Sequence, residues 1–174
     1  MRADLRFMLA APAHLIALGL GSGLAPRAPG TAGTLWAWLV YLLLAHALPA
    51  GALAALLLAA WPLGWWACTR TAQHLGVADP GAIVWDEVAA FWLLLWLLPP
   101  AWWVQALAFV LFRLFDALKP GPVGWADRRF KLRPGQAIGW AQGAGILLDD
   151  LVAALCCLPL AWGVVWLLQR GGAV

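Results

Sequence analysis

Charged residues are scarce in this chain: Asp, Glu, Lys and Arg make up 11% of its 174 residues, where roughly 25% is usual in a soluble domain. Hydrophobic residues make up 64%, and Trp occurs 14 times. This is the composition of an integral membrane protein. We therefore expect one membrane domain over residues 1–174, surrounded by the bilayer and without a nucleic-acid partner. The oligomeric state is left open.

Cysteine is also rare, and its placement argues against two kinds of site. Cys68, Cys156 and Cys157 all lie in apolar runs, without CxxC spacing and without metal-ligand histidines nearby. We predict that the three side chains are packing residues and form no disulfide.

A cleavable leader is not indicated. Arg2 and Arg6 precede an apolar stretch, as they would in a signal peptide, but Pro12 and His14 interrupt it and no clean small-residue cleavage site follows. We expect the N-terminal segment to be retained.

Long apolar runs are what the chain has in abundance. A helix needs about 20 apolar residues to cross the hydrocarbon core, and proline favours a break between helices. The run 35–68 divides into two spans at 48–51, the run 83–118 divides at 99–100, and a last span covers 146–168. The predicted fold class is therefore all-α, a polytopic membrane helical bundle of about five transmembrane helices.

The glycine-rich segment 13–24 is too short to cross a bilayer, and we expect it to be re-entrant or interfacial. It continues into "GLGSGLAPRAPGTAGT", whose glycines let backbone N–H groups approach an anion and whose Ser22, Thr31 and Thr34 add hydroxyls. No GK[ST] follows, so this is not a Walker A loop, and a tight turn at the membrane surface is the competing interpretation. His14 precedes the segment and is placed to handle a proton.

Basic residues gather on one side of this topology. With the N-terminus inside, the Lys and Arg residues of the connecting segments share the cytoplasmic side, and the two hairpin tips on the other side carry no charge. Arg170, after the last span, is the exception. The positive-inside rule therefore predicts this orientation.

Acidic residues mark the same side, at the ends of three spans: Asp86 and Glu87, Asp116, and Asp149 and Asp150. Carboxylates that converge repel each other, and oxygen-only ligands suit Mg²⁺ or Mn²⁺. Adjacent helical residues point about 100° apart, so we expect only one member of each pair to face a metal squarely. The other would hold a second metal or a neighbouring base.

A polar stripe completes the predicted site. Arg113, Asp116 and Lys119 follow each other at i, i+3 and i+6 in "FRLFDALKP". The two bases are suited to hold a phosphate. The simpler interpretation is that they pair with Asp116 or snorkel. Acids, bases and glycines together favour metal-assisted phosphate chemistry at the level of the lipid headgroups.

Four motifs, "HLIALGLGSGLAPRAPGTAGT", "IVWDEVAAFW", "FRLFDALKPGPVGWADRRF" and "GILLDDLVAAL", resemble the phosphatidylglycerophosphatase A family in order and spacing, over residues 13–157. The resemblance implies a Mg²⁺-dependent lipid phosphatase of the bacterial inner membrane, with its active site facing the cytoplasm. Its expected substrate is phosphatidylglycerophosphate, and its products are phosphatidylglycerol and phosphate. The segment from Arg128 to Trp140 is longer than the family usually has.

The resemblance also implies the site residues. Catalytic roles fall on Asp86, Glu87, Asp116, Asp149, Asp150 and His14, with Asp86, Glu87, Asp149 and Asp150 expected to hold Mg²⁺. Substrate-phosphate binding falls on Arg113, Lys119, Gly21, Ser22, Gly23, Gly30, Thr31 and Gly33.

Other classes of protein fit less well. A cation- or proton-coupled transporter would use the acids as a path, but such acids would lie along a route through the bilayer and these cluster at one predicted end. A phosphatidyl-group transferase would carry a DG…AR…G…D…D signature, which the sequence lacks. The nucleophile stays open between a water held by the metal, which we favour, and an aspartate.

Overall fold

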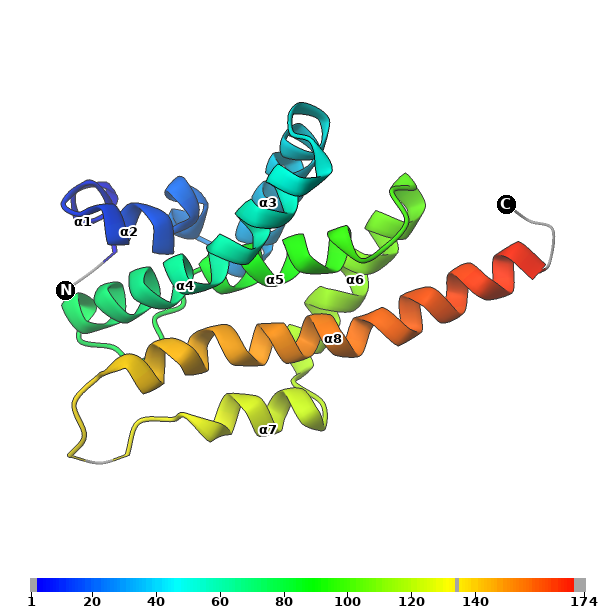
Figure 1. Ribbon diagram of the computed structural model, residues 1–174. Helices are drawn as coiled ribbons and strands as arrows, with labels where there is room; N and C mark the ends of the chain where they lie inside the picture. The colour runs from blue at the N-terminus through cyan, green and yellow to red at the C-terminus, as the bar shows by residue number, and fades with distance from the viewer. Residues whose placement is uncertain (1–2, 134, 171–174) are drawn as a thin grey trace.

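In a computed structural model, which describes residues 3–133 and 135–170, the protein is all-helical (Figure 1). Arg2, one of the charges behind the predicted orientation, lies outside the described residues. The helices are α1 (Leu5–Leu9), α2 (Pro12–Ala17), the 3-10 helix η1 (Gly19–Leu24), α3 (Pro29–Ala47), α4 (Ala50–Leu75), α5 (Trp85–Trp96), α6 (Trp102–Leu118), α7 (Pro122–Arg129) and α8 (Trp140–Arg170).

Three of the described helices, α3, α4 and α8, are long and apolar enough to cross a membrane. The helices expected to be spans three and four are shorter: α5 has 12 residues and α6 has 17. At about 1.5 Å per residue, α5 is roughly 18 Å long, against a hydrocarbon core of about 30 Å. A total of about five spans therefore stays a prediction.

Two breaks between helices lie at the prolines where the sequence predicts them. Pro49 is the N-cap of α4, directly after α3 ends at Ala47. The chain between α5 and α6 contains Pro99 and Pro100. Proline in extended backbone just before a helix start removes no helical hydrogen bond. These two breaks produce the α3–α4 and α5–α6 hairpins of Figure 1.

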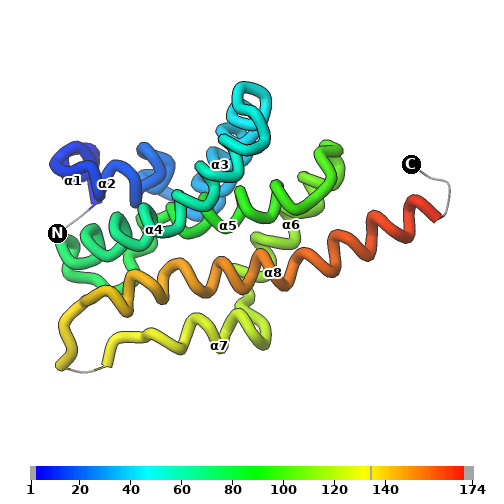
Figure 2. Tube along the Cα trace, in the orientation of Figure 1, coloured from blue at the N-terminus to red at the C-terminus, as the bar shows by residue number. Residues whose placement is uncertain are grey.

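Helix α5 lies inside the bundle and packs against α8, α3 and α4 (Figure 2). Phe91 and Leu94 are fully buried, as expected for a helix that is apolar on every face. Two indole N–H groups tie α5 to its neighbours: Trp85 donates to the Ala60 carbonyl at 3.0 Å and Trp92 to the Ala37 carbonyl at 2.8 Å. These contacts fix the first turn of α5, which carries Asp86 and Glu87.

The glycine-rich N-terminal segment packs closely against the chain that leads into α5. A Cβ at Gly23 would overlap the Ala82 carbonyl oxygen, and a Cβ at Gly33 would lie 2.7 Å from the Val84 Cβ. The Val84 N–H also donates to the Ala17 carbonyl at 2.9 Å. Residues 13–24 form most of α2 and all of η1, and Gly33 lies in α3. A re-entrant or interfacial placement of 13–24 in the bilayer stays a prediction.

Candidate active site

Three carboxylates from two helices converge inside the bundle. Asp86 and Glu87 lie in the first turn of α5, and Asp150 lies on α8. One oxygen from each lies within 4.8 Å of the others. The three residues are 9%, 8% and 3% exposed, respectively. We call them the acid group.

The acid group has the properties of a cation site. One buried oxygen on each residue, Asp86 Oδ1, Glu87 Oε2 and Asp150 Oδ1, has no hydrogen-bond partner among the described residues. A buried carboxylate oxygen without a partner is costly. Hard divalent cations bind oxygen-only ligand sets, and one oxygen from each residue lies close enough to share an ion, so the residues fit a metal such as Mg²⁺ or Mn²⁺.

Arg113 on α6 faces the acid group. Its Nη1 lies 2.9 Å from Asp116 Oδ2 and 3.6 Å from Glu87 Oε1, and it donates to Thr34 Oγ1 at 3.3 Å. Asp116 in turn lies close enough to Asp150 for the two carboxyl groups to interact. The predicted i, i+3 pair of Arg113 and Asp116 is therefore present, and it borders the acid group.

The N-terminus of α3 reaches the same place. A Cβ on Gly30 would overlap Glu87 Oε1 and lie 3.1 Å from Arg113 Nη2. No side chain caps this helix, whose N-cap Ala28 adopts a left-handed conformation (φ 47°). The N–H groups of Gly30 and Thr31 in the first helical turn have no intrahelical partner. Such N–H groups, with the helix dipole, favour an anion.

A second cluster lies beside the acid group and is centred on Lys119. Lys119 Nζ lies 2.5 Å from Asp127 Oδ1 on α7 and 2.6 Å from Asp149 Oδ2 on α8. Lys131 Nζ lies 2.7 Å from the other oxygen, Asp127 Oδ2. We call these four residues the lysine cluster. Lys119 is the C-cap of α6 and adopts a left-handed conformation (φ 45°), an unusual geometry for a non-glycine residue that a functional or packing constraint has to maintain.

Two pKa values reflect this pairing. Burial alone would lower the pKa of Lys119, but its hydrogen bonds to Asp127 and Asp149 raise it above the usual value. Burial alone would raise the pKa of Asp127, but hydrogen bonds from Lys119 and Lys131 lower it. Both groups are therefore charged near neutral pH, and the lysine cluster is held by ion pairs.

The predicted acids divide between the two clusters. Asp150 joins the acid group, whereas Asp149 accepts from Lys119, as the helical step of about 100° predicts for neighbours. Asp86 and Glu87 do not divide in this way, because both contribute an oxygen to the acid group. The expectation that only one member of each pair faces the site is therefore wrong for Asp86 and Glu87.

Other predicted site residues contact different parts of the chain. His14 Nδ1 donates to the Phe7 carbonyl at 2.7 Å, and its Nε2 lies 2.7 Å from His74 Nδ1. Ser22 donates to the Gly19 carbonyl, while Gly23 and Gly33 pack against 82–84. A Cβ at Gly21, which has a φ of 110°, would have only Met8 nearby. Among the described glycines of this segment, Gly30 is the one beside Glu87 and Arg113.

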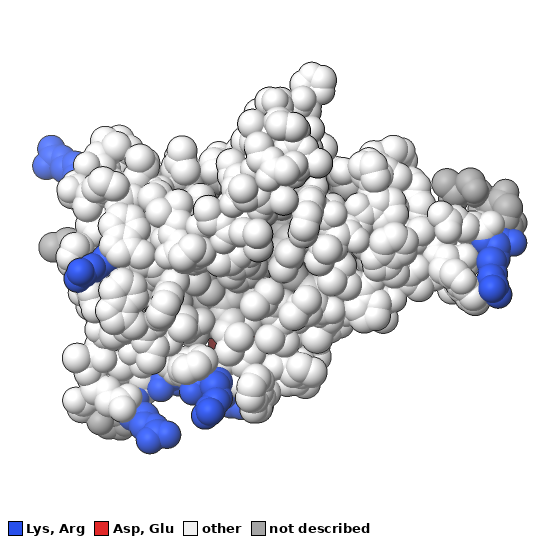
Figure 3. All heavy atoms as spheres, viewed as in Figure 1, with Lys and Arg blue, Asp and Glu red and all other residues white. Residues whose placement is uncertain are grey.

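Sequence reasoning missed Asp127 and Lys131. Both lie in "ADRRFK", which is typical of a solvated charged loop, and Arg128, Arg129 and Arg133 are indeed exposed. In Figure 3, Lys and Arg gather along the lower edge of the molecule, the side on which Figure 1 places α7. The i, i+4 spacing of Asp127 and Lys131 was the available signal.

Comparison with known proteins identifies the family. The profile of phosphatidylglycerophosphatase A matches residues 15–165. The chain is 38% identical to phosphatidylglycerophosphatase A of Escherichia coli over 86% of this chain and 81% of that protein. It is 35% identical to the Haemophilus influenzae phosphatidylglycerophosphatase A over 90% of this chain and 91% of that protein.

A third relative carries a different name. It is a putative phosphatidylinositol-3-phosphatase of Bacteroides thetaiotaomicron, 34% identical over 88% of this chain and 94% of that protein. No solved structure shows significant similarity to the chain.

An all-helical fold with long apolar helices and a buried carboxylate site defines a membrane enzyme, and the relatives indicate a phosphatase. The chain belongs to the phosphatidylglycerophosphatase A family.

Proposed function

We propose that this phosphatase hydrolyses the terminal phosphate of phosphatidylglycerophosphate in a Mg²⁺-dependent reaction, giving phosphatidylglycerol and phosphate. The observation that carries the proposal is the set of buried oxygens without partners on Asp86, Glu87 and Asp150, next to Arg113 and the N-terminus of α3. The carboxylates suit a bound metal ion, and Arg113 with the N-terminus of α3 suits a bound phosphate beside it. The names of the two phosphatidylglycerophosphatase relatives supply the substrate.

In this proposal, different residues bind the metal ion and the phosphate. Asp86, Glu87 and Asp150 hold the cation, which when bound offsets negative charge on the reacting phosphate. Arg113 and the N–H groups of Gly30 and Thr31 bind phosphate oxygens. Asp116 orients Arg113 through the contact of 2.9 Å.

Lys119 and Asp149 have a different part. Lys119 uses two of its three N–H donors on Asp127 and Asp149, so one donor remains for a phosphate oxygen. Asp149 fixes Lys119 and, in this proposal, does not bind the metal. His14 has a partner at each ring nitrogen, and we assign it to holding α2 against α1 and α4.

The direct test is phosphate release from phosphatidylglycerophosphate in detergent micelles by the purified protein. We expect turnover with Mg²⁺, none after chelation, and recovery when Mg²⁺ is added back. Full turnover in metal-free buffer would contradict the metal assignment. Phosphatidylinositol 3-phosphate is the comparison substrate, because one relative is named for it. Faster turnover of that lipid would replace the proposed substrate.

A cation- or proton-coupled transporter is not favoured. Its acids would line a path across the bilayer, whereas the acid group is enclosed beside a phosphate-type anion site, and the named relatives are phosphatases.

We also propose that the protein lies in a bacterial inner membrane with this site facing the cytoplasm. The two hairpin tips, at Pro49 and at Pro100, carry no charge, and exposed basic residues follow α7. Both features support that orientation. Reporter fusions at Pro49 and Pro100 are expected to report the periplasm, and one near Lys131 the cytoplasm. A cytoplasmic tip at Pro100 would contradict this topology.

A further inference from the structure

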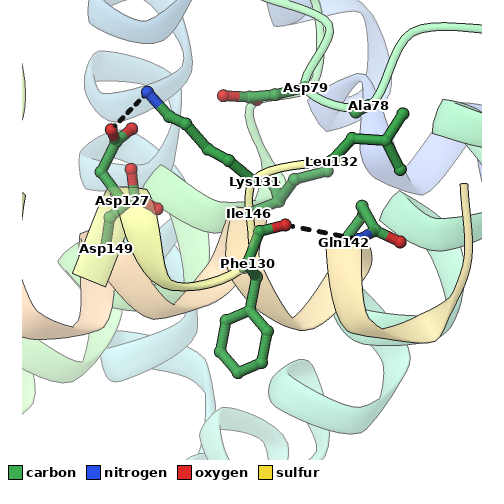
Figure 4. Close-up of a pocket in the computed structure, with 10 residues that line it drawn as sticks. Ala78, Asp79, Asp127, Phe130, Lys131, Leu132, Gln142, Ile146 and Asp149 are labelled. Carbon is green, nitrogen blue, oxygen red and sulfur yellow. Dashed lines mark hydrogen bonds and ion pairs between the residues drawn. The ribbon is translucent and has the colours of Figure 1, made fainter. Parts of the chain in front are cut away.

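A polar cavity beside the lysine cluster has no part in the proposed reaction. Its volume is about 360 Å³, within the range of about 300–1,000 Å³ common for small-molecule sites. It lies between the first half of α8, the end of α7 with the segment after it, and the loop at 78–79 (Figure 4). Its charged lining groups are Asp79, Asp127, Asp149 and Lys131.

The charges of the lining decide what the cavity can accept. Three carboxylates and one ammonium group line it, so the lining carries a net negative charge. Asp79 is exposed and has no hydrogen-bond or ion-pair partner within residues 3–133 and 135–170. A phosphate would be repelled here, whereas a hydroxyl group would donate to a carboxylate.

The cavity also adjoins the place proposed for the reacting phosphate. Asp149, on its wall, directly precedes Asp150 of the acid group. Asp149 also accepts from Lys119 at 2.6 Å, and the remaining donor of Lys119 is the one assigned above to a phosphate oxygen. In Figure 4 the Asp79 side chain extends over the cavity toward the side where Lys131 and Asp127 lie.

We propose that this cavity is the subsite for the glycerol unit of the substrate headgroup, which carries a free hydroxyl between the reacting phosphate and the phosphodiester. The inference rests on the proposed function and adds to it the part of the protein that recognises the headgroup. The glycerol hydroxyl donates to Asp79, and the cavity accepts a neutral polyol while it excludes a second phosphate. A lipid phosphomonoester without this hydroxyl gains nothing from the subsite.

Two variants change the cavity without touching the acid group. Asp79→Asn removes the charge of the acceptor, and Ala78→Leu fills space at the wall. Asp4→Asn is the matched control for charge, because Asn caps the start of α1 as well as Asp does. Ala141→Leu, at an exposed position of α8 outside the cavity lining, is the control for volume.

The measurement is KM and kcat for phosphatidylglycerophosphate, together with inhibition by glycerol 3-phosphate and by inorganic phosphate. An interaction that a substrate makes equally in the ground state and the transition state affects KM and leaves kcat unchanged, and we expect the hydroxyl contact to be of this kind. Asp79→Asn weakens the acceptor and Ala78→Leu obstructs the glycerol unit. We expect each variant to raise KM by about three- to tenfold, comparable to the value of one hydrogen bond, with kcat nearly unchanged. They should also lose the preference for glycerol 3-phosphate over inorganic phosphate, and the controls should keep both properties.

The outcomes separate the two proposals. A wild-type protein that releases no phosphate from phosphatidylglycerophosphate overturns the proposed function and, with it, the subsite. An active wild type whose cavity variants keep the same KM and the same inhibitor preference overturns the subsite alone. A lower kcat with unchanged KM also overturns it, because that result would place Asp79 in the chemical step.

Discussion

Two clusters of charged residues meet at consecutive positions of α8 and differ in how their charge is balanced. At Asp150, three carboxylates converge and each keeps a buried oxygen without a partner among the described residues. At Asp149, each carboxylate of the lysine cluster has an ammonium group within 2.7 Å. The lysine cluster balances its own charge, whereas the acid group needs protons or a cation to do so.

The size of the repulsion supports this contrast. The carboxylate oxygens lie no more than 4.8 Å apart, and two unit charges at that distance repel by roughly 3–4 kcal/mol at an effective dielectric constant of about 20. A whole domain is stable by only about 5–15 kcal/mol. The acid group therefore costs a substantial part of that stability unless a cation or protons neutralise it, and such a cost is typical of functional rather than structural residues.

The largest expected effect comes from breaking the acid group. Asp150→Asn, Asp86→Asn and Glu87→Gln should each lower turnover by more than about a hundredfold, because each removes a direct metal ligand. In chelator, Asp86→Asn and Asp150→Asn should unfold at the wild-type temperature or above, since they remove repulsion; Glu87→Gln also removes the ion pair with Arg113. Early melting combined with normal turnover of the folded fraction would show that the group is structural.

Gly30 tests the approach of α3 to the acid group. Gly30→Ala places a Cβ onto Glu87 Oε1 and should lower turnover by about tenfold or more, as misplacement of a phosphate-binding element does. Gly51→Ala is the matched control, because Gly51 holds the same second position of α4 and has nothing within 4 Å of its Cβ. Equal activity of the two variants would remove α3 from the site.

The lysine cluster should respond in stability. Lys119→Met leaves Asp127 and Asp149 with less positive charge nearby and should lower the free energy of unfolding by about 1–3 kcal/mol. Breaking a fully buried pair costs roughly 3–5 kcal/mol. The expected loss is smaller because the Lys119 side chain is 30% exposed. The unfolding temperature should fall by several degrees. An unchanged unfolding temperature would show that the ion pairs do not stabilise the fold.

The smallest effect is expected at the edge of that cluster. The Lys131 side chain is 64% exposed, and exposed ion pairs contribute about 0–1 kcal/mol. Lys131→Gln should therefore shift the unfolding temperature by no more than a degree or two. A shift as large as that of Lys119→Met would mean that Asp127 depends on both lysines equally.

Much of the arrangement follows from local sequence signals. Prolines at 49 and 99–100 marked the breaks between helices, and the paired acids indicated where carboxylates would converge. Asp86 and Glu87 do start α5, whereas α8 begins at Trp140, so Asp149 and Asp150 lie inside that helix and not at its start. The length of α5 did not follow, because Leu97 and Leu98 extend the apolar run beyond the end of the helix at Trp96. Hydropathy gives the length of the apolar run, which can be longer than the helix within it.

The sequence predicts that Asp149 and Asp150 point in different directions, but not which of the two joins the acid group. The helical step separates neighbours, but which one faces α5 depends on how α8 packs between α5 and α7. The glycines show the same limit. Gly23 and Gly33 fit as phosphate-binding residues in sequence, yet the structure uses them for close packing against 82–84, a tertiary contact that no local pattern contains.

The most direct test of the account is metal binding by the purified protein, followed by electron paramagnetic resonance with Mn²⁺ as the probe. We predict saturable Mn²⁺ binding by the wild type, at least about tenfold weaker binding by Asp150→Asn, and wild-type binding by Asp149→Asn. Mg²⁺ should displace the probe. Equal loss of binding in the two variants, or no saturable binding by the wild type, would contradict the assignment of the cation to Asp86, Glu87 and Asp150.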